Sequence, residues 1–513
     1  MPNLFIRKSV QDCEDDLAER GGLKRSLGKW QLTALGVGAT IGAGIFATTG
    51  TAIVGDAARP GAGPAIILSF ILTAITCGFA ALCYAEFAAM VPISGSAYTY
   101  AYASLGEFVA WIIGWDLIIE YAVGNIGVAI GWSGHFRELL GHFGISVPAW
   151  LMTDWRTASE AAKAVAAGTT DPGSVYLASA LDHAPRVAGL PIIANVPAAL
   201  VVLLITAVLV RGIRESANSN TAMVILKVGI VLFFVAVGSR FIDPSHWNDP
   251  AMGGFSPNGF AGISAGAAII FFSYIGFDAT STAAEEANNP AKDMPFGIIM
   301  SLVICTVLYV AVAAVMTGMA SWKQLGTPEP MITALALAEG SPRLLAASRL
   351  IIALGAVVAM GSVLLVFQLG QPRIFMSMSR DGLLPPFLAR LHPRFRTPYI
   401  GTILTGVFVA TFAAFANIAE VVDLTNIGTL FAFVIVSVGV IVLRIKEPDR
   451  RRPFRAPFVP FTPLISIAAC LYLMLQLPTV TWIRFGVWLA AGLVIYMLYG
   501  YRNSRLRRPR GSA

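Results

Sequence analysis

The sequence predicts an all-α membrane protein, and three observations carry this prediction. The chain has 513 residues, of which 56% are hydrophobic and only 13% are charged, whereas a soluble domain carries about 25% charged residues. Its mean hydropathy is +0.72. About 12 apolar runs reach the roughly 20 residues that a helix needs to cross a bilayer. The runs lie near residues 31–55, 65–91, 100–132, 195–212, 221–241, 262–285, 297–320, 345–378, 399–415, 421–443, 462–478 and 482–501.

Basic residues recur in alternate segments between these runs. With an even number of spans, those segments and both termini share one side of the membrane, and the positive-inside rule makes that side the cytoplasm. The net charge of +7 is thereby explained without nucleic-acid binding. We expect a multi-pass protein of the cytoplasmic (inner) membrane, with the lipid bilayer as a partner and both termini cytoplasmic. The basic residues are Lys24, Arg25, Lys29, Arg211, Arg214, Arg390, Arg394, Arg396, Lys446, Arg450, Arg451, Arg452, Arg455, Arg505, Arg507, Arg508 and Arg510.

The chain is expected to form one transporter domain over residues 31–503, with short segments on either side. The leader, residues 1–30, lacks the cleavage site of a signal peptide, so we expect it to stay in the cytoplasm. It fits either an interfacial helix or a disordered tail. Residues 504–513 form a basic cytoplasmic tail. The longest hydrophilic interruption, about 135–194, predicts an external loop with short helices.

The first span contains the most informative motif, GVGATIGAGIF, from Gly36 to Phe46. Gly36, Gly38, Gly42 and Gly44 make a poor helix, since each glycine costs roughly 1 kcal/mol relative to alanine. Unwound backbone survives at membrane depth only where it lines a cavity inside the protein. Close packing between helices through small residues is the alternative. This density of glycine favours a broken helix that holds a ligand.

A second interrupted span lies near residues 268–286, where Ser273 and Gly276 break the apolar run. This span is the sixth, the first of a second set of five. Interrupted helices at matching positions of two halves indicate a secondary transporter built from inverted repeats. In the alternative, Gly276 is a packing residue and Asp278 marks a helix end, but the pairing with the first span favours the transporter.

Each break offers backbone groups that match an amino acid zwitterion. The start of the second half-helix is electropositive and binds anions through free amides. The end of the first half-helix offers carbonyl groups to a cation. We predict that amides near Ala43 and Gly44 hold a substrate carboxylate. The predicted carbonyl ligands of the substrate ammonium are those of Thr40, Ile41, Phe272, Ser273 and Ile275.

Two charged residues lie deep in predicted spans. A charge at mid-bilayer is costly and marks a functional site by default. Lys227 lies in the fifth span, where burial disfavours the charged form, so that it could take up and release a proton; snorkelling to the surface is the alternative. Glu120, in the third span, could contact the substrate side chain or could be a protonated carboxyl bonded to a neighbouring helix. Asp116, one turn earlier, could share either role.

Nothing in the sequence suggests an enzyme or a cofactor. The few histidines do not pair with carboxylates at the spacing of a metal site, and no phosphate-binding Walker loop occurs, so ATP-driven transport by this chain is not expected. The 5 cysteines show no metal spacing. Buried small residues explain them better than a disulfide framework.

These motifs resemble the amino acid–polyamine–organocation superfamily, and most of all the bacterial branch of the cationic amino acid transporter family. The resemblance extends from about Gly28 to Tyr501. It implies a leucine-transporter-like fold with a 5+5 inverted repeat, broken first and sixth spans, two extra C-terminal spans and alternating access. The motifs are Gly36–Phe46, Pro92–Tyr102, Gly114–Gly124, Phe271–Ile298 and Gly370–Pro385.

The resemblance also implies roles for side chains. The same backbone atoms of the two breaks would bind substrate, and Lys227 matches a lysine that replaces a sodium ion in proton-coupled relatives. Glu120 matches as well. Phe367 departs from the pattern, because relatives that accept arginine tend to have a small residue there. A ring at this position should shorten the pocket, which favours small or medium neutral amino acids over lysine and arginine.

The sequence therefore predicts a proton-coupled symporter that imports neutral L-amino acids, with the amino acid and the proton as its ligands. An exchanger and a cationic amino acid transporter are alternatives in the same class. A transport-silent amino acid sensor is the alternative from another class, although a sensor would be expected to add a cytosolic signalling domain. The sequence leaves open a small single-span accessory subunit.

Overall fold

The computed structural model describes residues 5–8, 25–91, 95–168, 172–212 and 217–507. Most of the predicted leader and the end of the basic tail lie outside these residues. In the described chain, 9 helical segments are long and apolar enough to cross a bilayer. Three further apolar helices, α10, α17 and α19, are shorter, and all of these segments overlap the predicted runs.

The α-helices, in chain order, are α2 (Lys29–Thr40), α3 (Thr49–Val54), α4 (Ile66–Met90), α5 (Ser96–Ser104), α6 (Glu107–Ile118), α7 (Gly124–His142), α8 (Trp155–Ala166), α9 (Pro172–His183), α10 (Val196–Arg211), α11 (Ala217–Gly238), α12 (Ser245–Asn248), α13 (Gly259–Ile270), α14 (Pro290–Met319), α15 (Pro330–Leu337), α16 (Pro342–Arg380), α17 (Tyr399–Phe415), α18 (Ile418–Lys446), α19 (Phe461–Leu475), α20 (Thr479–Ile495) and α21 (Tyr501–Asn503). The π-helices are η1 (Gly44–Thr48), η3 (Ile119–Val123) and η11 (Tyr496–Gly500). The 3-10 helices are η2 (Gly63–Ala65), η4 (Ala149–Leu151), η5 (Ser239–Phe241), η6 (Pro250–Met252), η7 (Phe271–Tyr274), η8 (Asp278–Glu286), η9 (Trp322–Gln324), η10 (Pro386–Ala389) and η12 (Arg505–Arg507). The strands are β1 (Arg186–Val187) and β2 (Leu190–Pro191), paired antiparallel.

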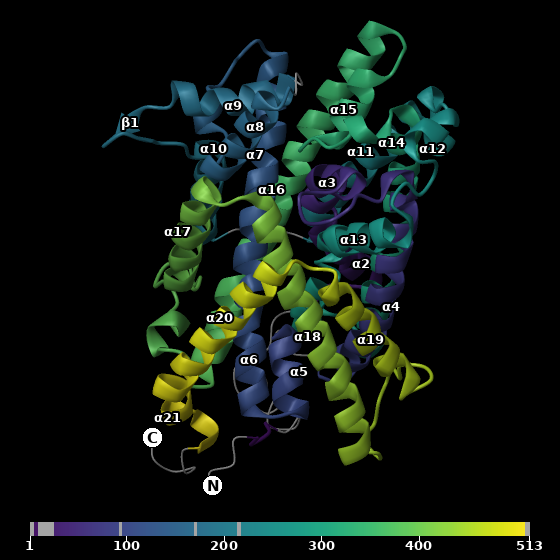
Figure 1. Cartoon of the computed structure of the whole chain (residues 1–513). Helices are drawn as coiled ribbons and strands as arrows, with labels where there is room; N and C mark the ends of the chain where they lie inside the picture. Colours follow the sequence, from purple (N-terminus) through teal and green to yellow (C-terminus); the bar gives the residue numbers. More distant parts are fainter. Residues whose placement is uncertain (1–4, 9–24, 92–94, 169–171, 213–216, 508–513) are drawn as a thin grey trace.

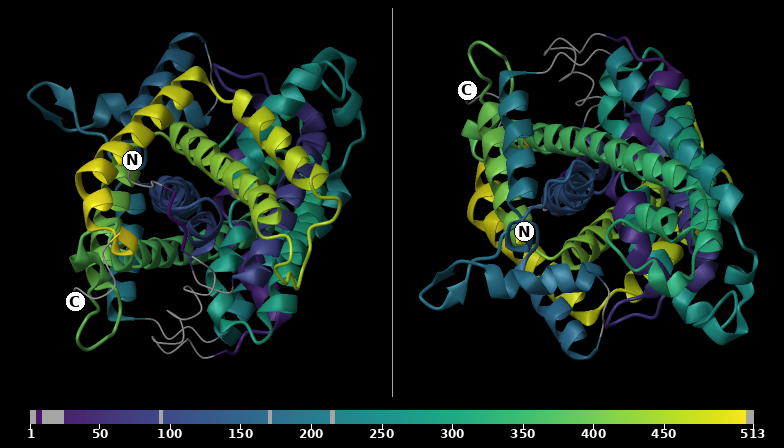
Figure 2. Two further views of the ribbon diagram at one scale, coloured as in Figure 1. Left: turned by 90° about the horizontal axis from the view of Figure 1, so that it is seen from below. Right: turned by 90° about the horizontal axis from the view of Figure 1, so that it is seen from above.

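The helices form one elongated bundle with both chain ends at the same end of it (Figure 1). We call that end the terminal face. The opposite face carries α8, α9, the β1–β2 hairpin, α12 and α15. Seen along the bundle, α6 and α7 run near the middle and the other helices surround them (Figure 2).

Burial identifies the spans at the centre of the bundle. In the segments Lys29–Val54 and Glu107–His142, 89% of the most apolar window is buried, and in Gly259–Glu286 the share is 83%. The other long spans reach at most 67%. The first, third and sixth spans therefore form the core, and lipid-facing helices enclose them.

The third predicted span differs from the structure at both ends. Instead of one run from about residue 100, the short helix α5 ends at Ser104 and α6 starts at Glu107. Gly106 makes the turn with φ +102°, and an ideal Cβ there would lie 2.7 Å from the carbonyl oxygen of Phe5. At the other end α7 continues to His142, so the loop expected from about 135 starts later. Arg137 lies in this last part, where an ion pair with Glu329 accommodates its charge.

Candidate functional site

Both predicted interruptions are present. In the first span, α2 ends at Thr40, and Ile41 and Gly42 are not helical. The second half of this span starts with the π-helix η1. In the sixth span, Ile275 adopts an extended conformation after η7, and Gly276 has φ +123° before η8 starts. The prediction of broken first and sixth spans is confirmed at the level of the backbone.

The two breaks cross in direct contact, and glycines allow it. An ideal Cβ on Gly44 would overlap the Cα of Ser273 and lie 2.6 Å from its hydroxyl oxygen. An ideal Cβ on Gly276 would lie 2.7 Å from the carbonyl carbon of Ala39. Close packing through small residues is therefore present at both glycines, and Gly276 also lies in an unwound segment, whereas Gly44 starts η1. The Ser273 hydroxyl is buried at this crossing and has no hydrogen-bond partner among the described residues.

Lys227 of α11 is fully buried beside the first break. Its Nζ donates hydrogen bonds to the carbonyl oxygens of Gly38 at 2.6 Å and Ile41 at 3.3 Å. The side chain therefore does not snorkel to the surface. It binds the carbonyl end of the first half-helix, as a bound cation would. Its part in proton coupling stays a prediction.

Two of the carbonyl groups predicted for the substrate ammonium, those of Thr40 and Ile41, have protein donors here. Ile41 accepts from Lys227, and Thr40 accepts from the hydroxyl of Tyr309 in α14 at 3.0 Å. A carbonyl oxygen can accept two hydrogen bonds, so these bonds do not exclude a ligand. Sequence reasoning missed Tyr309. The only available signal was a tyrosine within an apolar span, whose buried hydroxyl needs a partner.

One face of α7 brings the remaining predicted residues together. An ideal Cβ on each of three glycines, one turn apart, would nearly touch a residue of another span. The pairs are Gly124 with Phe367 (3.5 Å), Gly127 with Phe272 (3.4 Å) and Gly131 with Ala43 (3.3 Å). The Phe367 ring also packs on Tyr121, with ring centroids 5.7 Å apart. Phe367 thus reaches the same helix face as the two breaks, about one turn from Phe272.

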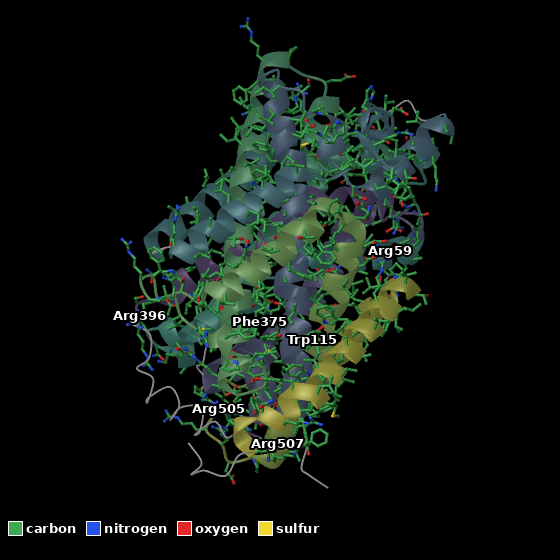
Figure 3. All side chains as sticks on the ribbon, turned by 90° about the vertical axis from the view of Figure 1, so that its left-hand side faces the viewer. Arg59, Trp115, Phe375, Arg396, Arg505 and Arg507 are labelled. Atoms are coloured by element: carbon green, nitrogen blue, oxygen red, sulfur yellow. The ribbon has the colours of Figure 1, made fainter. Side chains whose placement is uncertain are left out.

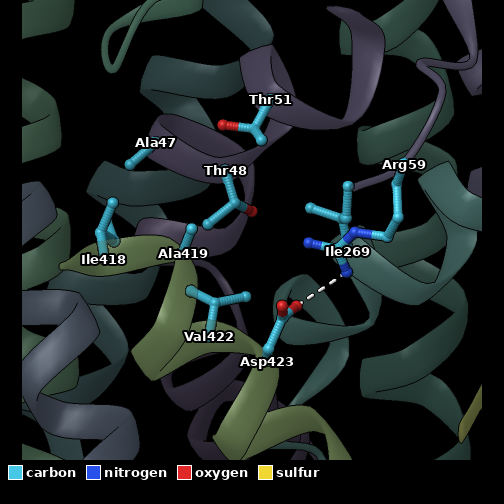
Figure 4. Close-up of a pocket in the computed structure, with 9 residues that line it drawn as sticks. All are labelled: Ala47, Thr48, Thr51, Arg59, Ile269, Ile418, Ala419, Val422 and Asp423. Atoms are coloured by element: carbon cyan, nitrogen blue, oxygen red, sulfur yellow. Dashed lines mark hydrogen bonds and ion pairs between the residues drawn. The ribbon is translucent and has the colours of Figure 1, made fainter. Parts of the chain in front are cut away.

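A small pocket opens beside the second half of the first span, on the side of the opposite face (Figure 4). Arg59 and Asp423 form an ion pair across it, with 2.8 Å between Nη1 and Oδ1. Arg59 also binds Asp56 at 2.6 Å. The pocket is lined by Ala47, Thr48, Thr51, Arg59, Ile269, Ile418, Ala419, Val422 and Asp423. Since Thr48 donates its hydroxyl hydrogen to the Gly44 carbonyl, the pocket lies one turn from the crossing.

Comparison with known proteins identifies the family. The profile of the amino acid permeases matches residues 27–499. The chain belongs to the amino acid permease family. Two Bacillus subtilis proteins are similar over nearly all of both chains: a methylthioribose transporter, 42% identical over 99% of this chain and 100% of its own length, and a branched-chain amino acid permease, 44% identical over 99% of each. A vacuolar cationic amino acid transporter of Arabidopsis thaliana is 35% identical over 88% of this chain and 68% of its own. The protein is a membrane transporter of this family and not an enzyme.

Glu120 of this permease lies close to a residue that the sequence suggested only as the mark of a helix end. It lies in the π-helix η3, is buried, and has the buried Asp278 carboxyl that starts η8 as a close neighbour. One oxygen of each carboxyl, Oε2 and Oδ2, has no hydrogen-bond partner in the described chain. Asp278 also accepts a hydrogen bond from the amide of Gly276, at 3.3 Å. The third span and the break of the sixth therefore meet through two acids.

Three carboxylates at the terminal face of the permease, the buried Glu86 and Glu107 and the partly buried Asp381, each bind several donors. Glu107 accepts hydrogen bonds from Tyr102, Tyr496, Ser504 and Arg507. Asp381 accepts from Lys8 and Tyr98. Glu86 binds Arg444, Arg452 and the amide of Ala456. Because Lys8 and Arg507 come from the two chain ends, both ends take part in these contacts.

Proposed function

We propose that this permease is a proton-coupled symporter that imports small or medium neutral L-amino acids by alternating access. The observation that carries the proposal is the crossing of two interrupted helices beside Lys227, which is bonded to one of the broken ends. The free backbone groups at such breaks match the two charges of an amino acid. The name of the branched-chain relative supports an amino acid substrate.

The proposed orientation places the terminal face in the cytoplasm. Of the arginines labelled in Figure 3, Arg396, Arg505 and Arg507 lie nearer the terminal face than Arg59 does. An excess of basic residues marks the cytoplasmic side of membrane proteins. In this orientation the leader and the basic tail are cytoplasmic, and the α8–α9 segment with its hairpin is external.

Substrate binding requires the two breaks to separate slightly. In this structure Gly44 packs on Ser273, so the amides of the second half-helix face protein rather than a ligand. A substrate carboxylate that enters between them would reach these amides and the unpartnered Ser273 hydroxyl. The substrate ammonium would compete with Lys227 and Tyr309 for the carbonyls of Ile41 and Thr40. Separation of the two breaks is therefore coupled to the hydrogen bonds that Lys227 makes with the first break.

Proton transfer at Lys227 supplies the coupling in this proposal. The charged ammonium of Lys227 donates charge-assisted hydrogen bonds to the carbonyl oxygens of Gly38 and Ile41, and such bonds are roughly twice as strong as neutral ones. Loss of the proton weakens both bonds and frees the carbonyl end of the first half-helix. Two ionised carboxylates at close range repel each other, so Glu120 and Asp278 form a second place where one shared proton is favoured.

Phe367 supports the neutral substrate class. Its ring fills the space between Gly124 and Tyr121, close to the position of a substrate side chain beyond Phe272. A long cationic side chain would need that space. An aliphatic side chain would instead gain from contact with the rings, at about 0.8 kcal/mol for each buried methylene.

Uptake of labelled leucine into proteoliposomes, driven by an artificial pH gradient, tests the proposal. We expect accumulation that a protonophore abolishes. Lys227→Met should abolish it in a folded protein, while Lys446→Met, an exposed lysine at the end of α18, should not. Uptake that does not depend on the pH gradient but requires an amino acid inside the proteoliposomes would instead indicate an exchanger. Strong competition by arginine in the unmodified protein would contradict the neutral substrate class.

A further inference from the structure

The β1–β2 hairpin is an ordered element whose side chains are left uncovered. Its residue pairs are Arg186 with Pro191 and Val187 with Leu190, and the amide of Ile192 closes it onto Pro185 at 2.8 Å. Val187 and Leu190 are 63% and 72% exposed. The hairpin projects sideways beside the start of α10, beyond the other elements in both views of Figure 2. An exposed apolar hairpin of this kind is marginal in water unless something covers it.

The helix that follows the hairpin is too short to span a bilayer by itself. With 16 residues, α10 is about 24 Å long at 1.5 Å per residue, against a hydrocarbon core of about 30 Å. Leu200 and Leu204 on its outer face are 58% and 67% exposed, as lipid-facing residues are. Its neighbour α17 has only 17 residues. This side of the bundle therefore offers lipid an apolar face that is shorter than the bilayer.

The hairpin continues that apolar face at the end away from the terminal face. Ile192, between the hairpin and α10, is exposed as well. From Ala184 to Arg211 the sequence contains no acidic residue, and its basic residues are Arg186 and Arg211, at the two ends of the stretch. A cationic residue beside an exposed apolar tip is suited to lipid phosphate, as at other membrane interfaces.

We propose that the hairpin lies in the interfacial region of the lipid leaflet at the opposite face, with Val187 and Leu190 among the acyl chains and Arg186 at a lipid phosphate. It would thereby lengthen the apolar surface over α10 and reduce the hydrophobic mismatch on this side of the bundle. The hairpin bonds only part of its backbone, which suits the interface and not the hydrocarbon centre.

A spin label at Leu190→Cys, in a chain whose native cysteines are replaced by alanine, tests this in nanodiscs of a zwitterionic phospholipid. We expect collisions with oxygen close to those of a label at Leu204→Cys on α10. Collisions with a water-soluble nickel chelate should be several-fold fewer than for a label at Lys163→Cys, on exposed α8. Adding Val187→Asp should move the Leu190 label towards water and leave the Leu204 label unchanged.

Two results would overturn the proposal. A Leu190 label as accessible to the nickel chelate as the Lys163 label would place the hairpin in water. A label shielded from both reagents, with dipolar broadening between copies, would place the hairpin in a contact between two permease chains. Because the readout is local, a transport defect in any variant does not affect the conclusion.

Discussion

The two ends of the permease are closed in different ways. At the opposite face, the approach to the crossing of the broken spans is narrowed by one ion pair, Arg59 with Asp423, beside a small pocket. At the terminal face, Glu86, Glu107 and Asp381 each hold several donors, and the two chain ends supply some of them. Arg59 also pairs with Asp56, so the contacts beside the pocket involve one arginine and two acids, whereas those at the terminal face form a larger network.

This difference indicates which way the structure opens more easily. A hydrogen bond to a charged group is worth about 1.5–3 kcal/mol, so the network at the terminal face costs far more to release than one ion pair. A carrier that alternates between two faces must break one closure while the other forms. We infer that the chain ends help to set the balance between the two states, although they lie far from the substrate.

Among the substitutions, we expect the largest loss of transport at the crossing of the two broken spans, which the contacts at both faces affect. Gly44→Val places a branched side chain where Ser273 now packs, so the crossing cannot close and both states are disturbed. Such overpacking costs about 1–3 kcal/mol in stability alone. We expect loss of transport and at least a tenfold loss of leucine affinity, measured by equilibrium binding. Gly78→Val, where an added Cβ would meet nothing within 4 Å, is the control. Unchanged affinity would place the binding site elsewhere.

The next effect concerns the network at the terminal face. Glu107→Gln removes the charge that holds Arg507 and should weaken the closure by about 1.5–3 kcal/mol. We expect faster alkylation of a cysteine at Ser281, which lies behind α5 and contacts Ser96. Glu447→Gln, whose pair with Arg7 is partly exposed at 3.6 Å, should have little effect.

A smaller effect is expected at the opposite face. Asp423→Asn removes one partner of Arg59, which keeps Asp56, so the loss should be smaller than in Glu107→Gln. Alkylation of a cysteine at the buried Thr48 should become faster, by less than the change at Ser281 in Glu107→Gln. Asp56→Asn is the matched control because it leaves the Arg59–Asp423 pair intact. Equal effects at the two faces would contradict the comparison.

The last prediction concerns stability rather than access, and it is a dependence of the free energy of unfolding on pH at the opposite face. Burial raises the pKa of Glu329 to about 6, and Arg137 beside it offsets this only in part. The folded protein therefore holds this proton more tightly than the unfolded chain does. The contribution of Glu329 to stability is present below its ordinary range near pH 4.5 and is lost as the pH rises through 6. Its size is on the order of 2 kcal/mol.

Thermal unfolding between pH 4.5 and 7 measures this contribution. Glu329→Gln should remove the part of the pH dependence that falls in this window and should raise stability at pH 7. Glu138→Gln, a more exposed carboxyl that also contacts Arg137, should leave it unchanged. The same pH profile in the unmodified protein and in Glu329→Gln would show that another group titrates there.

The helices and their interruptions could be predicted from the sequence because both depend on local composition. Apolar runs mark the spans, and the glycines of the first break together with Gly276 mark the unwound segments. The burial of Lys227 beside the first break could also be predicted, since a lysine at mid-bilayer needs a polar partner. Helix ends were predicted less accurately. The charge of Arg137 suggested that the third span had already ended, but α7 continues to His142 because Arg137 forms an ion pair with Glu329 from a distant segment.

Contacts between distant parts of the chain could not be read from composition. Tyr309 and Thr40 are 269 positions apart, and Arg59 and Asp423 are 364 apart. Both pairs depend on how the spans are arranged, and no local signal carries that information. The same holds for Glu120 and Asp278, whose proximity exists only because the third and sixth spans meet at this height.

The π-helix at Glu120 has a consequence for the geometry of the third span. A π turn contains about one residue more than an α turn, so the part of the helix beyond it is rotated by roughly 100° relative to a regular helix. This offset lets Glu120 and the glycines from Gly124 onwards face the same two breaks. In a regular α-helix of the same sequence this offset would be absent, and Gly127 would turn away from Phe272 with no loss of any binding group. Along this segment the number of residues matters as much as their identity.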